Sequence, residues 1–315
     1  MIGLKSLTMS DAALYSRNML KGISELKNGN WNPGFNLFEY RVYNPIKIAL
    51  GAKTPLSRAP EWVPGLDVVN RHLVITNEQG IGDTIMYSRF ITLLRELPLR
   101  SVTIAMTRGL NPLISQIKGC DGIVSDMDCP APAIRVRALS LPSLLLQYSL
   151  LPEKQPEHVY GSSGYIDLGP IIKSDVVGFC WRSENSSWNA EAKKIPQEVA
   201  ENFYKKLQKK KEVVSLQIQP DFMPNYLTGT DWLDTARKLK ALDAVVTIDT
   251  GVAHLAGALG VRTINLIGAA EYAGWFYHPD NSPTTPWYDS MELIWYKPYT
   301  NWKAGLDEAL KRVCR

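Results

Sequence analysis

The chain has 315 residues, of which 45% are hydrophobic and 21% charged, and its formal net charge is +4. These proportions are typical of a folded globular protein and exclude a disordered or low-complexity chain. No apolar run reaches the roughly 20 residues of a membrane-spanning helix, and the N-terminus lacks the pattern of a secretory signal, so we expect a cytoplasmic protein.

The length suits two α/β domains of ordinary size. The four cysteines have no CxxC spacing, so we expect neither a zinc site nor a disulfide framework. The densest basic cluster lies in the lysine-rich run 205–211. It indicates a solvated helix face, with a contact to a polyanion such as nucleic acid as the alternative.

The N-terminal region predicts a helical and irregular lead-in over residues 1–66. Apolar residues at helical spacing in 1–30 indicate one helix or a helix pair, and Asn28-Gly29-Asn30 is a stop signal. Residues 31–66 are rich in Pro, Gly and aromatic side chains and show little periodicity, which favours an irregular segment.

Residues 67–165 predict a first α/β domain, because strands and helices alternate at the spacing of a parallel sheet. Its expected elements are strands at 73–77, 101–106 and 122–124 and helices at 83–97 and near 110–118. Pro130 and Pro132 interrupt this pattern, and residues 139–151 carry the apolar surface of one further element.

Residues 166–300 predict a second α/β domain of the same kind, so the expected fold is two Rossmann-like, doubly wound domains that face a cleft. Its expected elements are strands at 176–181, 213–217, 244–248, 263–267 and about 292–295 and helices at 195–211, 234–240 and 252–259. A final helix at about 302–313, within the terminal segment 301–315, is expected to cross back toward the first domain.

Two strand–glycine–helix turns are the most informative features of the chain. In the second domain, a β-branched strand ends in Asp249-Thr250-Gly251 and small helix formers follow. Such a turn presents free backbone N–H groups and the positive end of a helix dipole, which favour an anion such as phosphate. In the first domain, Gly80-Ile81-Gly82-Asp83 forms the matching turn, with Asp83 placed to cap the helix that follows.

These segments resemble the bacterial glycosyltransferase family 9 and heptosyltransferase group. The resemblance rests on several motifs that occur in the family's order: Glu78-Gln79-Gly80-Ile81-Gly82-Asp83-Thr84, Asp234-Thr235-Ala236, Leu242-Asp243, the run 249–260, Ser282-Pro283 and Pro286-Trp287-Tyr288. Gly29-Asn30-Trp31, Gly34 and Glu39-Tyr40-Arg41 are similar to the tail that joins the last tetratricopeptide repeat to the transferase in one subgroup. Residues 1–66 would then be a repeat remnant.

The resemblance implies a GT-B fold, with the acceptor on the N-terminal domain and a nucleotide-diphosphate sugar on the C-terminal domain. It also implies inversion at the anomeric carbon by a hexosyl- or heptosyltransferase that needs no metal ion and no cofactor besides its donor substrate. Asp126-Met127-Asp128 has the letters of a metal-chelating DxD motif. It follows a short edge-like strand outside the second domain, so we do not expect it to bind a metal.

On the acceptor side, the resemblance gives Asp83 the role of the base that takes the proton of the acceptor hydroxyl. The alternative is a purely structural helix cap. Gln79, Gly80 and Gly82 would complete the acceptor-side loop.

On the donor side, Thr250, Gly251 and the amide of Val252 are the expected cradle for the diphosphate, since a side chain at Gly251 would obstruct the anion. Asp249 would hold the turn, and His254 would reach either the ligand or a neighbouring loop. Further donor-side candidates are Arg182 and Lys194, with Lys193 a near rival, as neutralising cations, Gln217 near the nucleotide, and Gly268 at the rim of the pocket.

Aromatic residues 272–288 allow two interpretations, a sugar platform or interdomain packing, and we favour packing for Tyr272, Trp275 and Trp287. The acceptor hydroxyl could belong to a glycan, a lipopolysaccharide sugar, a protein, or a hydroxylated base in DNA of a phage-like element. A catalytically silent nucleotide-sugar-binding scaffold is the alternative of another class. The sequence does not indicate the sugar, the nucleotide or the oligomeric state.

Overall fold

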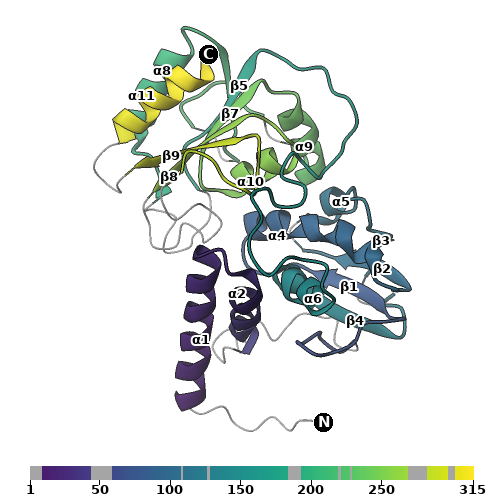
Figure 1. Cartoon of the computed structure of the whole chain (residues 1–315). Coiled ribbons are helices and arrows are strands. Elements are labelled where there is room, and N and C mark those ends of the chain that lie inside the picture. Colours follow the sequence, from purple (N-terminus) through teal and green to yellow (C-terminus); the bar gives the residue numbers. More distant parts are fainter. Residues whose placement is uncertain are drawn as a thin grey trace.

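The structure is a computed structural model that describes residues 9–43, 59–107, 109–125, 128–183, 193–218, 221–227, 229–268, 282–296 and 302–315. Two α/β domains, each with its own sheet, lie one above the other in Figure 1, and a pair of helices flanks the first of them. Among the described residues, no helix combines the length and the apolar character needed to cross a membrane.

The first domain is built on a four-stranded parallel sheet in the order β3-β2-β1-β4. Its strands are β1 (His72–Thr76), β2 (Ser101–Ala105), β3 (Gly122–Ile123) and β4 (Ala133–Arg137). The helices are α4 (Ile81–Ser88), the 3₁₀ helix η2 (Arg89–Glu96), α5 (Asn111–Ile114), the 3₁₀ helix η3 (Ala138–Ser140) and α6 (Leu141–Gln147).

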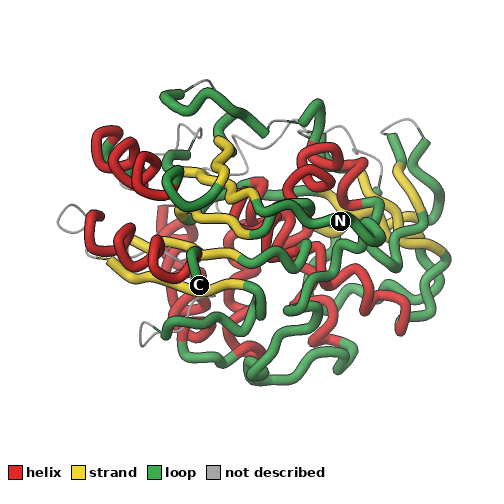
Figure 2. Tube along the Cα trace, turned by 90° about the horizontal axis from the view of Figure 1, so that it is seen from above, coloured by secondary structure: helices red, strands yellow, loops and turns green. Residues whose placement is uncertain are grey.

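The second domain is built on a five-stranded parallel sheet in the order β6-β5-β7-β8-β9. Its strands are β5 (Val176–Cys180), β6 (Glu212–Ser215), β7 (Ala244–Ile248), β8 (Thr263–Gly268) and β9 (Met291–Tyr296). The helices are α8 (Gln197–Leu207), α9 (Trp232–Lys240), α10 (Gly251–Ala258) and α11 (Trp302–Val313). Side chains of α8 and α11 pack in one core and those of α9 and α10 in another, so helices cover both faces, as Figure 2 shows.

The bounds of every strand that the sequence predicts agree with the structure to within two residues. All of these strands pair in parallel, and the interior of each except the two-residue edge strand β3 is mostly buried, which produces the continuous β-branched runs that the sequence shows. The fold class predicted from the sequence, two doubly wound α/β domains, is therefore confirmed.

Strand β4 was not predicted, because Pro130 and Pro132 precede it and it carries two arginines. Arg135 and Arg137 alternate with buried Ile134 and Val136, so the strand has only one apolar face. It nevertheless pairs with β1 along its full length, from His72 opposite Ala133 to Thr76 opposite Arg137.

The lead-in contains α1 (Met9–Lys27), as expected, and two helices that the sequence analysis assigned to irregular structure, α2 (Trp31–Phe38) and the 3₁₀ helix η1 (Glu39–Tyr43). Pro33 and Gly34 looked like breakers, but proline is tolerated in the first helical turn. Gly34 is required by packing, since a Cβ there would lie 2.7 Å from Cγ of Leu26 on α1.

The prediction that the final helix crosses back toward the first domain is wrong. Helix α11 packs on α8 and on strands β7, β8 and β9, at the far end of the second domain in Figure 1. The apolar stripe of Trp302, Leu306, Ala309 and Val313 explains this placement, because it completes the core on the α8 face of the second sheet.

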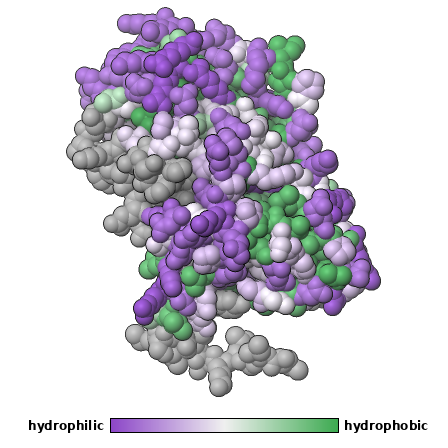
Figure 3. Space-filling view, in the orientation of Figure 1, coloured by the Kyte–Doolittle hydropathy of each residue, from purple (hydrophilic) through white to green (hydrophobic). Residues whose placement is uncertain are grey.

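The core that joins the two domains is continuous. One cluster of buried side chains runs from Trp31 of the lead-in through Val102 of the first sheet to Ala253 and Leu293 of the second domain. The outer surface in Figure 3 is largely hydrophilic over the second domain, and apolar side chains gather on the right-hand side of the first. The continuous core fixes how the two sheets, and therefore their loops, face each other.

Candidate functional site

The two glycine turns meet between the domains. A Cβ on Gly82 would lie 2.6 Å from Cδ2 of His254 and 3.4 Å from Cα of Gly251. A Cβ on Gly251 would lie 3.7 Å from the backbone N of Gly82. The N-terminal ends of α4 and α10 are thus neighbours, which brings the predicted acceptor-side and donor-side turns to one place.

The turn of the first domain holds Asp83 in a defined position. Gly80 is the N-cap residue, and the backbone N–H of Gly80 donates to Oδ2 of Asp83 over 3.0 Å. Asp83 therefore caps the helix from its third position by reaching back, instead of from the N-cap position. Gln79 adopts a φ of +59°, the left-handed region that a residue with a side chain rarely occupies. The loop is strained at the residue that turns the chain toward Asp83.

The Asp83 carboxyl group is partly exposed but closely surrounded by protein. Burial raises its pKa to about 6 from 3.8, and the negative charges of Asp249 and Glu78 act in the same direction. The hydrogen bond from Gly80 and the positive charge of Lys193 oppose this shift. At neutral pH the group is mostly ionised yet more basic than an ordinary aspartate, which suits a general base.

The turn of the second domain follows the fully buried strand β7. Thr250 is the N-cap of α10 in an extended conformation, and its side chain makes no capping hydrogen bond. Its hydroxyl lies 3.5 Å from Oγ1 of Thr247 and 3.9 Å from Sγ of Cys180. The first amides of α10, which include those of Gly251 and Val252, stand at the positive end of the helix dipole.

Lys193 is the basic residue that the structure places at this turn. Its Nζ donates to Oδ2 of Asp249 over 2.7 Å, and its positive charge also acts on Asp83 and His254. Lys194, the residue expected here from the sequence with Lys193 as its near rival, is half-buried beside it. Adjacent lysines in a loop give no periodic signal that separates them, so only the structure distinguishes their positions.

His254 is buried between the two turns. Its Nδ1 lies 3.1 Å from the hydroxyl of Tyr288, and its Nε2 lies 3.9 Å from Oδ1 of Asp249. Burial lowers the pKa of His254 to about 4; the charges of Lys193 and Arg89 act in the same direction and Asp249 opposes them. A neutral imidazole therefore contacts the acceptor-side loop at Gly82, which corresponds to the neighbouring-loop alternative.

Gln217 has a structural task in this arrangement. Its Oε1 accepts hydrogen bonds from the backbone N–H groups of Trp181 at 2.9 Å and Arg182 at 3.1 Å, and its Nε2 donates to the Arg182 carbonyl at 3.2 Å. The side chain thereby fixes the loop after β5. The guanidinium of Arg182 lies over the ring of Trp181, 5.0 Å from its centroid.

Several expected features lie at or beyond the limits of the described residues. Gly268 ends strand β8, and Tyr272 and Trp275 lie outside the described residues, as do Asp126 and Met127 of the DxD-like sequence. Trp287 is fully buried between the domains, 5.9 Å from Trp31 by ring centroids, as the packing interpretation predicts. Within the described ranges, no group of three or more His, Cys, Asp and Glu side chains could hold a metal ion.

Sequence reasoning missed Arg89, a fully buried residue of the first domain. Its Nη1 donates to the carbonyl of Trp287 over 2.7 Å, and its guanidinium lies over the rings of Tyr165, Trp287 and Tyr288. It sits at one end of a chain of contacts that leads through Tyr288 to His254. An arginine in an apolar helical pattern carries no sequence signal for such a role.

The arrangement joins a basic carboxylate on one domain to an anion-binding helix end and a lysine on the other. Such a pair can take a proton from a nucleophile and stabilise the negative charge of a departing group. Both substrates of a transfer reaction would have to meet beside these two turns.

Comparisons with known proteins point to the same class of fold. Residues 180–300 match the family model of glycosyltransferase family 9 (heptosyltransferase). The fold is similar to that of the family 9 glycosyl transferase from Veillonella parvula DSM 2008, with a TM-score of 0.52, 14% identity and coverage of 80% of this chain and 92% of that one. No curated protein matches the chain in sequence.

Two heptosyltransferases from E. coli also share the fold. WaaC, in complex with ADP, has a TM-score of 0.52 and 12% identity, and the match covers 77% of this chain and 99% of that one. The ADP-heptose lps heptosyltransferase II has a TM-score of 0.53 and 14% identity, with coverage of 77% and 97%. These likenesses establish the two-domain GT-B architecture for the chain.

Proposed function

We propose that this chain transfers a sugar from a nucleotide-diphosphate donor to an acceptor hydroxyl with inversion. Through residues 180–300 the chain belongs to glycosyltransferase family 9, and it is a glycosyltransferase. The observation that carries this proposal is the contact between the two glycine turns at Gly82 and Gly251. It brings Asp83 and the start of α10 close together.

In the proposed reaction, Asp83 takes the proton of the acceptor hydroxyl as the hydroxyl oxygen attacks the anomeric carbon. The bond between that carbon and the diphosphate oxygen breaks, and the nucleotide diphosphate leaves with the electron pair. Because attack and departure occur on opposite faces, the anomeric configuration inverts. A pKa of about 6 keeps most Asp83 ionised at pH 7 while its basicity stays useful.

The departing diphosphate would be held by the first amides of α10 and by cationic side chains. Thr250 and Gly251 bring the backbone to the phosphate, and Lys193, already paired with Asp249, supplies a positive charge at the same turn. Arg182 and Lys194 belong to the same loop region. Because these groups can neutralise the charge of the departing diphosphate, we propose a metal-independent reaction with no further cofactor.

For the acceptor we propose a carbohydrate hydroxyl. The two E. coli proteins of the same fold are described as heptosyltransferases, one of them acting on lps. Hydroxyl groups of proteins and of modified DNA bases remain the other outcomes of an acceptor screen.

The test is release of nucleotide diphosphate from a panel of ADP-, UDP- and GDP-sugars, with and without added saccharide. We expect one donor to be consumed and Asp83→Asn to lower kcat by about 10²- to 10⁴-fold. Asparagine keeps an oxygen for the Gly80 amide, so the nucleotide diphosphate should still raise the melting temperature of this variant. Asp128→Asn, a change at an exposed carboxylate of the first domain, is the matched control.

Two results would overturn the proposal. The first is that no donor in the panel is consumed and no nucleotide diphosphate shifts the melting temperature. The second is that Asp83→Asn turns over as fast as the control. Retention of anomeric configuration in the product would remove the inverting mechanism alone, and loss of activity in a chelator would remove metal independence alone.

A further inference from the structure

We propose that Arg41, in the helical lead-in, is a positioning residue for the acceptor-side loop: through Glu78 it holds the segment that carries Asp83. The lead-in would then be part of the catalytic architecture, acting on Asp83 through Glu78. The inference rests on the proposed function only in its use of Asp83 as the base.

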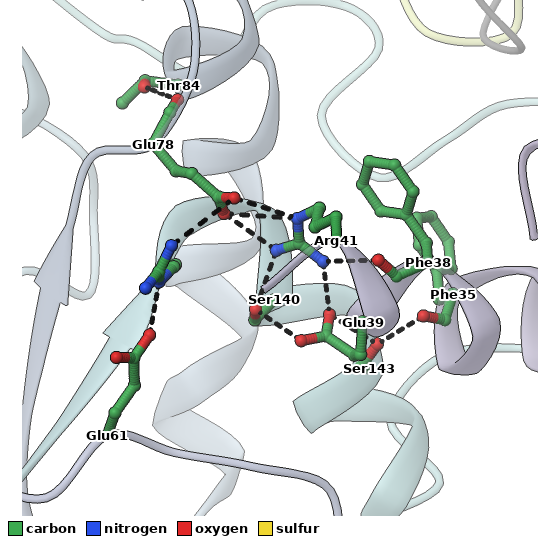
Figure 4. A network of polar contacts seen from close by, with 10 residues as sticks. Phe35, Phe38, Glu39, Arg41, Glu61, Glu78, Thr84, Ser140 and Ser143 are labelled. Carbon is green, nitrogen blue, oxygen red and sulfur yellow. Dashed lines mark hydrogen bonds and ion pairs between the residues drawn. The ribbon is translucent and has the colours of Figure 1, made fainter. Parts of the chain in front are cut away.

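Arg41 is buried and its hydrogen-bonding capacity is saturated (Figure 4). Its Nε donates to the two carboxylate oxygens of Glu78 at 3.2 and 3.3 Å, and its Nη2 donates to Glu78 at 2.9 Å and to Ser140 at 2.9 Å. Its Nη1 donates to Glu39 at 2.8 Å and to the Phe38 carbonyl at 3.2 Å. All five N–H groups of the guanidinium therefore have acceptors, so its orientation is fixed.

The second carboxylate of the network ties the arginine to the first domain. Glu39 accepts hydrogen bonds from the hydroxyls of Ser140 at 2.8 Å and Ser143 at 3.1 Å, and both serines lie on the η3–α6 segment. Ser140 also accepts from Arg41, so the lead-in, the segment after β4 and the loop after β1 share one buried polar network (Figure 4). Removal of one partner from a buried ion pair of this kind strongly destabilises the folded protein.

The loop transmits this anchorage from Glu78 to Asp83 over a short path. The hydroxyl of Thr84 donates to the backbone carbonyls of Glu78 at 3.1 Å and Gly80 at 3.2 Å. Gly80 in turn donates its N–H to Asp83. Between them, Gln79 is held at φ +59°, a conformation that persists only where the surroundings impose it. The fixed side chain of Glu78, the residue before Gln79, is one such constraint.

Arg41 also sets the electrostatic surroundings of the base. The charged groups that face Asp83 are Glu78 on its own loop and Asp249 and Lys193 from the second domain, and His254 on α10 is neutral. Arg41, together with Arg137 at 3.8 Å, offsets the charge of Glu78. Removal of Arg41 would leave Arg137, at the longer distance, to offset the negative charge of Glu78, so Asp83 would hold its proton to higher pH.

The test follows the titration of Asp83 directly, by ¹³C NMR of the full chain with labelled aspartate carboxyl carbons assigned through Asp83→Asn. In Arg41→Met we expect the pKa of Asp83 to rise by roughly half a unit or more. Amide exchange over residues 78–84 should speed up. Glu78→Gln should move the pKa in the opposite direction. Arg95→Met, which removes an exposed ion pair with Asp121 in the same domain, is the matched control.

The kinetic arm uses whichever nucleotide sugar the donor panel identifies. We expect Arg41→Met to lower kcat by roughly tenfold or more with the donor KM unchanged, and the acid limb of the pH profile to shift with the NMR pKa. Arg41→Lys should recover part of the pKa shift but little of the exchange protection, since an ammonium cannot reproduce the planar fork.

The inference is overturned if Arg41→Met folds and the titration of Asp83 and the exchange of residues 78–84 match those of Arg95→Met. If Arg41→Met does not fold, Glu78→Gln and Arg41→Lys decide by the same two readouts. Absence of turnover with every donor would reject the proposed function, but the NMR and exchange results would still confirm or reject the anchorage.

Discussion

Asp83 illustrates how a single functional residue opposes the stability of its own fold. Its pKa is about 6 in the folded chain and 3.8 in the reference state, so the folded protein binds this proton more tightly than the unfolded one. The free energy of unfolding that Asp83 contributes therefore falls as the pH rises from about 4 to about 6, and it stays low above that range. The reaction we propose would use, at neutral pH, the ionised form that the fold disfavours.

We accordingly expect Asp83→Asn to be more stable than the native chain at pH 8, by about 1–2 kcal/mol. At pH 4 the native carboxyl is already neutral, and the difference should vanish. The measurement is urea unfolding at both pH values, with Asp128→Asn alongside. His254, whose pKa is lowered, destabilises both proteins equally between pH 6.5 and 4, so it cancels in the comparison. A variant less stable than the native chain at pH 8 would contradict this account.

Gly251 allows binding to be separated from folding. A Cβ at this position meets no atom closer than 3.7 Å, so Gly251→Ala should keep the native stability or gain up to about 1 kcal/mol in a helix. The same methyl group would stand where an anion approaches the amides of α10. We expect nucleotide diphosphate to lose its effect on the melting temperature of this variant. A thermal shift equal to that of the native chain would mean that the diphosphate binds elsewhere.

The candidate site residues could be predicted from the sequence where their place depends on the local backbone. The two glycine turns could be recognised because glycine, a capping acid and a buried strand leave a local pattern. Lys193 could not be separated from Lys194, and the structural task of Gln217 was invisible, because each depends on where a distant strand or loop lies. Arg41 has no local pattern of its own beyond the segment Glu39-Tyr40-Arg41, which is similar to a family tail.

Between elements, Arg89 links the end of α4 to the segment that precedes β9. Its Nε donates to the Met86 carbonyl at 2.9 Å and its Nη1 to the Trp287 carbonyl at 2.7 Å. Three aromatic rings surround its guanidinium, at 4.7 to 5.1 Å from their centroids. Backbone carbonyls and aromatic faces thus stabilise a buried positive charge at the junction of the domains.

Arg89→Met should therefore cost about 2–4 kcal/mol of unfolding free energy, since two buried carbonyls lose their donor and the cation–π contacts are lost. The matched change Arg95→Met, at an exposed ion pair, should cost less than about 1 kcal/mol. Urea denaturation of both variants provides the measurement. Equal losses of unfolding free energy in the two variants would show that Arg89 does not stabilise the contact between the domains.

Elements were predicted well where one rule dominated and missed where two competed. The strands of the second sheet were found because burial on both faces selects β-branched runs. Strand β4 was missed because its arginines and nearby prolines mask the apolar face, and α2 was missed because Pro33 and Gly34 resemble breakers. The direction of α11 was wrong, because an amphipathic stripe does not say which core it will complete.

Over the whole molecule, the continuous core predicts one cooperative unfolding transition. The aromatic cluster of Trp31, Tyr87, Phe90 and Trp287 joins the lead-in, the first domain and the second domain. Separate domains with a polar interface would unfold separately, whereas these three regions share their buried surface. The sequence indicated two domains, but it did not indicate that they share buried surface with each other and with the lead-in.

Trp287→Ala should cost about 3–5 kcal/mol and split the transition into two. Tryptophan fluorescence and far-ultraviolet circular dichroism should then give different urea midpoints. Trp302→Ala removes a buried ring of the same size from the α11 core, so it should lower stability without uncoupling the domains. Coincident midpoints in Trp287→Ala would show that the remaining interface is enough to make the two domains unfold together.

The contact between Gly82 and His254 limits how closely the two domains can approach each other. A single hydrogen atom on the first domain meets the imidazole ring, and a methyl group there would approach its Cδ2 to 2.6 Å. The close approach of the two domains at this point therefore depends on the missing side chain of Gly82. A larger residue at position 82 would push the two domains apart, whereas position 251 has room for a methyl group. Substitution at position 251 should therefore alter ligand binding with the domains still in place, whereas substitution at position 82 should alter the fit of the two domains.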